Sequence, residues 1–150
     1  MAPLFQKDQP DDWFLPKDVR TQLAETFKNL DGDVVLETFT QTGVNDEFAD
    51  YTLKFCADLA RLSDRISTRN FAIPSDRAKK LGVTAAPTLC LNPDDCHIRF
   101  LGAPVGEEGK SLITAILLLS LGKSALSELS VQLLDGLKEE RLAQVFVSPT

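Results

Sequence analysis

The chain has 150 residues, of which 43% are hydrophobic and 25% are charged, and it carries a net charge of −6. This composition is ordinary for one globular domain that buries a real core. The acidic balance argues against nucleic acid or an anionic membrane surface as a partner, because both bind clusters of lysine and arginine. No signal peptide is visible, since charged residues interrupt the opening "MAPLFQKDQPDDWFLP". Three cysteines without a framework pattern indicate a reducing, cytoplasmic setting.

The first part of the chain predicts an arm, a helix and a strand. Residues 1–16 are rich in proline and are expected to form an irregular arm. The apolar residues 13–15 are expected to hold this arm against the domain. The helix begins at Asp18 and is expected to end at Gly32, because glycine commonly follows a helix C-terminus. The strand covers residues 33–39, which are rich in β-branched side chains. Four apolar residues at helical spacing support the helix: Val19, Leu23, Phe27 and Leu30.

A second helix is predicted after a turn at Gly43, with Asn45 or Asp46 as its N-cap. Cys56 lies within the apolar face of this helix, where a free cysteine behaves as a small hydrophobe. A second strand over residues 65–73 follows. The predicted apolar stripe of the helix consists of Phe48, Tyr51, Thr52, Phe55, Leu59 and Leu62.

The rest of the chain continues the alternation of helices and strands. The apolar run that begins at Leu112 is too short to span a membrane, so it predicts a fully buried core helix. The resulting order, β-α-β-α-β-β-α after a leading helix, predicts an α/β fold with a mixed central sheet and helices on both faces. The expected elements are a short helix opened by Pro74 and closed by Gly82, a hairpin of strands 87–91 and 96–101 around "NPDD", a helix over 112–121, an amphipathic helix over 127–137, and a last strand over 141–147.

Pro87 stands at the mouth of the third strand, in "GVTAAPTLCL". Proline cannot donate to a strand ladder, so an inner strand should exclude it. One explanation is a trans proline at the first residue of an edge strand. The other is a cis bond, which in proteins usually makes a local bend. The order of elements favours the second, and we expect a cis Ala86–Pro87 bond with Pro87 opposite the turn at residues 43–46.

The element order and "GVTAAPTL" resemble the thioredoxin and glutaredoxin superfamily, in which a cis-proline faces the redox motif. Two longer stretches, "FTQTGVNDEFADYTLKFCADLARLSDRI" and "IRFLGAPVGEEGKSLITAILLLSLGKSALS", look like the N-terminal half of the glutaredoxin-like protein disulfide oxidoreductases. They are similar also to the N-terminal domain of the alkyl hydroperoxide reductase flavoprotein subunit. Both families place two thioredoxin folds in tandem. The resemblance runs from about Val19 to Thr150.

The sequence departs from this pattern at the redox motif. Thioredoxin-type chemistry needs Cys-x-x-Cys at the start of the first crossover helix, because the helix end lowers the thiol pKa and the second thiol resolves the mixed disulfide. The corresponding segment "TGVNDEFAD" has no cysteine and places Asn45, Asp46 and Glu47 at the helix start. Carboxylates cap a helix well but do not attack sulfur. We therefore expect no catalytic residue, cofactor or metal site in this chain.

Cys90 and Cys96 flank the turn of the predicted hairpin. A four-residue loop, 92–95, would pair Leu91 with Cys96 and so place the two cysteines on opposite faces, where they could not bridge. A loop of three or five residues would restore the parity and allow a regulatory disulfide. A metal site formed with His97 lacks a fourth ligand.

The resemblance also divides the chain. It implies a thioredoxin-like domain without redox motif over 17–122, and a linker helix with the first strand of a truncated second unit over 123–150. The last residues, "VFVSPT", resemble the strand that leads into Cys-Pro-x-Cys in the tandem family. The alternative is a natural short protein that kept a remnant of this strand. An uncovered last strand would pair with an edge of this sheet, extend freely, or associate with another copy of the chain.

The function implied by the resemblance is that of a non-catalytic thioredoxin-fold half, which supports disulfide and dithiol electron transfer by a Cys-x-x-Cys unit. Its partner would be that second unit, with a flavin and NAD(P)H reductase upstream if the parent is a reductase. The alternatives are a free-standing thioredoxin-like binding or scaffold protein, and a redox sensor that uses Cys90 and Cys96.

Overall fold

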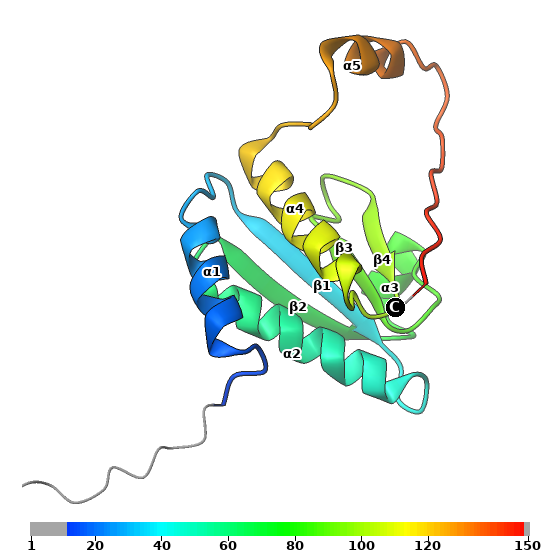
Figure 1. Cartoon of the computed structure of the whole chain (residues 1–150). Helices are drawn as coiled ribbons and strands as arrows, with labels where there is room; N and C mark the ends of the chain where they lie inside the picture. Colours follow the sequence, from blue (N-terminus) through cyan, green and yellow to red (C-terminus); the bar gives the residue numbers. More distant parts are fainter. Residues whose placement is uncertain (1–11, 149–150) are drawn as a thin grey trace, which may run out of the picture.

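The computed structural model describes residues 12–148 (Figure 1). From the first strand to the fourth helix, the elements follow the predicted order β-α-β-α-β-β-α, after one leading helix. The predicted arm is described from Asp12 onward, and residues 1–11 lie outside the described part. The elements are α1 (Lys17–Phe27), β1 (Val34–Thr40), α2 (Asp46–Leu62), β2 (Ile66–Ala72), α3 (Asp76–Leu81), β3 (Thr88–Leu91), β4 (Ile98–Leu101), α4 (Glu107–Leu121) and α5 (Glu128–Asp135).

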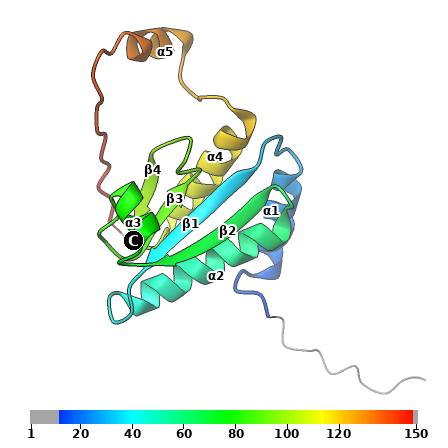
Figure 2. The ribbon, with the colours of Figure 1, turned by 180° about the vertical axis from the view of Figure 1, so that it is seen from behind.

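The four strands form one mixed sheet in the order β2-β1-β3-β4. β1 and β2 are parallel, because α2 carries the chain back across the sheet between them. β3 is antiparallel to both β1 and β4. Helices α1, α2 and α4 cover one face, and α3 covers the other, as Figures 1 and 2 show from opposite sides. The predicted mixed sheet with helices on both faces is therefore confirmed.

Two apolar clusters hold these layers together. The smaller cluster lies on the α3 face of the sheet. In it Phe39 stacks on Phe71, with 5.4 Å between the ring centroids, and the residues around them are Ala78, Val83 and Cys90. The alternation of β1 side chains explains the division, because successive residues of a strand point to opposite faces. The larger cluster consists of Phe27, Leu30, Val34, Leu36, Phe55, Cys56, Leu59, Ile66, Leu89, Leu91, Leu112 and Ile116.

The described part of the N-terminal arm docks on α2, as its apolar residues predict. Three contacts hold it: the Arg61 guanidinium lies 3.6 Å from the centre of the Trp13 ring, Phe14 meets Tyr51 edge-on, and the Leu15 N–H donates to the Asp58 carboxylate at 2.7 Å. α1 then begins at Lys17, directly after Pro16.

Gly32 does not end α1, which stops at Phe27. Its role is close approach to α4. The Gly32 N–H donates to the Ser120 carbonyl at 2.9 Å, and the Ser120 hydroxyl donates back to the Gly32 carbonyl at 2.7 Å. A Cβ at position 32 would lie 2.8 Å from the Ser120 carbonyl oxygen, so only glycine fits there.

Three predicted details of the helices are wrong. Phe48 is 48% exposed and not part of the buried stripe, because it lies in the first turn of α2, ahead of the buried stretch. Pro74 does not open α3; it follows a second cis bond, Ile73–Pro74, and precedes the N-cap Ser75. α4 is not buried all round, since only Leu112, Ile116 and Ser120 are buried. None of the described helices is long and apolar enough to cross a membrane.

The predicted last strand does not form. Residues 141–147 have no regular structure, and Leu142, Val145 and Phe146 are 84%, 86% and 90% exposed. A strand needs a neighbour for its backbone hydrogen bonds, and none of the four described strands pairs with this segment. Between pairing with an edge of its own sheet and free extension, the structure shows free extension.

Candidate functional site

The start of α2 and the loop before β3 meet beyond the carboxyl end of β1. The Ala86–Pro87 peptide bond is cis, as predicted. The Asn45 side-chain amide donates to the Ala86 carbonyl at 2.8 Å, which joins the helix start directly to this loop. Pro87 stands just outside the ladder, and its carbonyl accepts from the Gly102 N–H at 2.8 Å. The sheet tolerates this proline because β3 begins one residue later, so Pro87 does not have to donate a hydrogen bond to a neighbouring strand.

Asn45 is the N-cap of α2, but its side chain makes no capping hydrogen bond. Its backbone is left-handed, with φ 52° and ψ 40°, a conformation that asparagine adopts more readily than most residues. Asp46 instead folds back, and its carboxylate accepts from the Gly43 N–H at 2.9 and 3.1 Å. Together with Glu47 it places negative charge in the first turn, where the helix dipole favours it. These groups stabilise the helix start, and none of them is a sulfur nucleophile.

The three cysteines lie away from this helix start. Cys56 is 1% exposed within α2, and burial raises its pKa to about 12. Cys90 is buried on the other face of the sheet, and burial raises its pKa as well. Such thiols are poor nucleophiles because the thiolate is scarcely formed at neutral pH. The predicted burial of Cys56 is confirmed.

The β3–β4 hairpin has a six-residue loop over 92–97, not the four-residue loop predicted. Leu91 pairs with Ile98, and Cys90 pairs with Arg99. Asn92 causes the difference, because its left-handed backbone (φ 41°) starts a turn and its side-chain oxygen accepts from β1 at 2.6 Å. Cys96 therefore lies in the loop, where its thiol donates to the Leu91 carbonyl at 2.9 Å. All three cysteines are free, and the described residues hold no cluster that could bind a metal ion.

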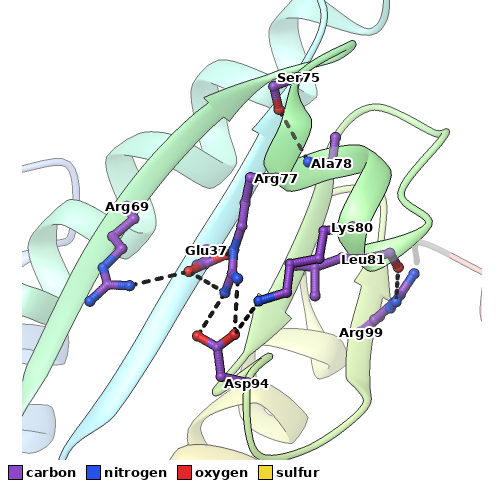
Figure 3. Close-up of polar contacts among 9 residues, drawn as sticks. All are labelled: Glu37, Arg69, Ser75, Arg77, Ala78, Lys80, Leu81, Asp94 and Arg99. Atoms are coloured by element: carbon purple, nitrogen blue, oxygen red, sulfur yellow. Dashed lines mark hydrogen bonds and ion pairs between the residues drawn. The ribbon is translucent and has the colours of Figure 1, made fainter.

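A buried ion-pair network, which the sequence analysis missed, lies on the α3 face (Figure 3). Glu37 on β1 is fully buried, and its carboxylate accepts from Nε and Nη2 of Arg77 at 2.7 and 2.9 Å. The same guanidinium donates twice to Asp94, at 2.9 Å each time. Arg69 lies 3.5 Å from Glu37 on the other side. Arg77 thus ties α3 to both the sheet and the hairpin loop.

The strand register places Glu37 in one row of the sheet with residues of the other three strands. Glu37 is opposite Arg69 on β2 and opposite Cys90 on β3, and Cys90 is opposite Arg99 on β4. Arg99 donates to the Leu81 carbonyl at the end of α3. This bond joins β4 to the end of α3, just before the segment that leads into Pro87. A single sequence signal could have revealed the network: Glu37 is a charged residue inside an otherwise apolar strand, and such a residue needs a partner.

No family model and no curated protein matches the chain. Solved structures do match it. A protein disulfide oxidoreductase from Aeropyrum pernix K1 is 24% identical, with a TM-score of 0.73 over 82% of this chain and 55% of that chain. The fold is thioredoxin-like. The NTD_N/C domain of alkylhydroperoxide reductase AhpF from Enterococcus faecalis is 27% identical, with a TM-score of 0.65 over 79% of this chain and 58% of that chain. This chain thus spans little more than half of each of these two structures.

The resemblance stated from the sequence is confirmed at the level of these structures. In the thioredoxin-like fold of this chain, the cis-proline loop and the start of α2 are adjacent, as their hydrogen bond shows. The start of α2 holds Asn45, Asp46 and Glu47, none of which carries a thiol. The structure therefore brings Asn45 next to the Ala86–Pro87 bond, whereas Cys90 and Cys96 lie on β3 and in the following loop.

Proposed function

We propose that this chain is the non-catalytic thioredoxin-fold half of a tandem thiol-disulfide oxidoreductase or of a reductase N-terminal domain. It supports electron transfer by a Cys-x-x-Cys unit that is not within these 150 residues. The observation that carries the proposal is the α2 start, where Asn45 takes the N-cap and bonds to Ala86, beside the cis Pro87. The scaffold of a redox site is present there, and its thiols are replaced.

The partner in this proposal is a second thioredoxin-fold unit of the same parent chain. Two observations support it. The two structures that match this chain extend well beyond the matched part, since it covers 55% and 58% of them. The segment over 141–147 is apolar and exposed, as expected of a strand whose sheet lies elsewhere. In a reductase parent, a flavin and NAD(P)H domain would supply the electrons.

In this proposal the residues at the α2 start and in the cis-proline loop form a contact surface and take no part in the chemistry. Asn45 and the cis-proline loop present a thiol-free surface, and the Glu37–Arg77–Asp94 network fixes α3, which precedes that loop. In this role the chain packs against the catalytic unit and shapes its cleft.

An insulin-reduction assay with dithiothreitol tests the non-catalytic part of the proposal. We expect no rate above that of dithiothreitol alone, and the same result for Cys96→Ser, which removes the least buried thiol. Turnover that disappears in Cys96→Ser or Cys90→Ser would overturn the proposal and favour a redox sensor. The coding sequence beyond residue 150 tests the tandem part, with Cys-x-x-Cys expected within a few codons. A continuation without that motif contradicts it.

A further inference from the structure

Exposed apolar side chains gather at the C-terminal end of the described chain. Among the described residues, ten of the sixteen exposed large hydrophobics lie within 126–147. α5 buries no residue, although its pattern is amphipathic. Helical spacing places three leucines of α5 on one stripe, and an uncovered stripe of this kind marks an interaction surface. The stripe consists of Leu129, Leu133 and Leu134, which are between 52% and 68% exposed.

An apolar groove runs beside the uncovered side of α4. It has a volume of about 490 Å³ and lies between α4, β4 and the segment that follows α4. Lys123 contributes the charge at the end where the chain leaves α4. This groove explains why α4 is so apolar yet only partly buried. The apolar side chains that line it include Ile98, Ala115, Leu118, Leu119 and Leu126.

The linker between the two helices holds α5 away from the groove of its own chain. Gly122, with φ 59°, ends α4 in a turn where the N–H groups of residues 122 and 123 bond to the Leu119 and Leu118 carbonyls, each at 3.1 Å. The Ser124 hydroxyl then accepts from Leu126 at 2.9 Å, and Ser127 caps α5. Figures 1 and 2 show α5 beyond the end of α4. These bonds order the linker on both sides of Ala125.

We propose that the leucine stripe of α5 fills the α4–β4 groove of a second copy of this chain, and that the second copy does the same in return. One chain carries both halves of a helix-in-groove contact, which is the requirement for a closed two-fold dimer. The charges agree with this arrangement. Lys123 lines the linker end of the groove, and Glu128 lies in the first turn of α5. When the α5 helices of the two copies run antiparallel to each other, Lys123 of each copy meets Glu128 of the other. The contact leaves the α2 start and residues 141–147 free, so it does not depend on the function proposed above.

Sedimentation equilibrium of the 150-residue chain tests the proposal, with a concentration-dependent monomer–dimer equilibrium expected. Leu133→Lys places a charge in the stripe and should weaken the dimer about tenfold or more. Leu118→Lys should do the same from the groove side. Gln132→Lys is the matched control, since it adds the same charge on the polar side of α5 and should leave the dimer unchanged. Circular dichroism confirms that each variant keeps its fold.

A charge exchange tests the orientation. Lys123→Glu should weaken the dimer a few-fold, because exposed pairs contribute little, and adding Glu128→Lys should restore it. A wild-type chain that is monomeric at all concentrations overturns the proposal, and protection of the α5 amides in that monomer would indicate fold-back. Aggregates larger than a dimer, or a dimer that survives both Leu133→Lys and Leu118→Lys, also overturn it.

Discussion

The side-chain amide of Asn45 donates to the carbonyl oxygen of Ala86 at 2.8 Å, and this bond ties the start of α2 to the cis-proline loop. An N-cap asparagine would ordinarily use its side chain on the first helical N–H groups. Here the side chain reaches across to another element. The bond gives the α2 start a structural role beside the cis-proline loop.

Asn45→Ala should lower the free energy of unfolding by about 1 to 2 kcal/mol, because it removes the hydrogen bond and leaves a left-handed backbone to a residue that disfavours it. Asn45→Gly loses the same bond but adopts φ 52° freely, so its loss should be smaller. Urea denaturation measures both. An equal loss in the two variants would show that the backbone conformation contributes nothing.

Glu37→Gln should destabilise the fold by about 1 to 3 kcal/mol, because it removes the buried carboxylate that accepts two hydrogen bonds from the Arg77 guanidinium. The matched variant is Asp94→Asn, which breaks the exposed half of the same network and should cost much less. Chemical denaturation of the two variants compares them directly. A cost for Asp94→Asn as large as that for Glu37→Gln would contradict the network as described.

The Arg77–Asp94 ion pair predicts that the stability of the fold depends on pH. The hydrogen bond from Arg77 lowers the pKa of Asp94 below its ordinary value. The stabilisation is therefore present above the unfolded carboxyl pKa and is lost as the pH falls through the lowered one. Denaturation midpoints measured from neutral pH into acid should fall less steeply for Asp94→Asn than for the wild type. Identical slopes would show that this carboxylate does not contribute.

Cysteine labelling should follow burial. Cys96 is partly exposed in its loop, whereas Cys56 and Cys90 are buried. With the pKa of Cys56 raised to about 12, its thiolate is scarcely formed at pH 8. Iodoacetamide followed by peptide mass spectrometry should find Cys96 modified first and Cys56 only after unfolding. Early modification of Cys56 would contradict its placement in the core.

Deletion of residues 143–150 should leave the melting temperature nearly unchanged. The described part of this segment has no regular structure, and its apolar side chains are exposed. It therefore contributes little to the core that unfolds. Differential scanning calorimetry measures the effect. Unfolding of the shortened chain would place the segment in the core of this domain and favour the short-protein alternative.

The element order and the cis Ala86–Pro87 bond could be predicted, because hydrophobic periodicity and proline chemistry are local. The hairpin loop was predicted two residues too short, since the left-handed Asn92 leaves no clear local signal. Residues 141–147 have strand composition, but strand formation depends on a neighbour that composition does not supply. The partners of Glu37 come from α3 and β2, and only the folded chain brings them together.

The most direct test of the central claim restores the missing thiols. Asn45→Cys with Phe48→Cys places Cys-x-x-Cys at the start of α2, where the helix end lowers the pKa of the first thiol and Phe48 is already exposed. In an insulin-reduction assay, we expect turnover from this double variant and none from the wild type or from Asn45→Ser with Phe48→Ser. Turnover by the wild type, or none by a folded double variant, would contradict a thioredoxin-like site that lost its thiols.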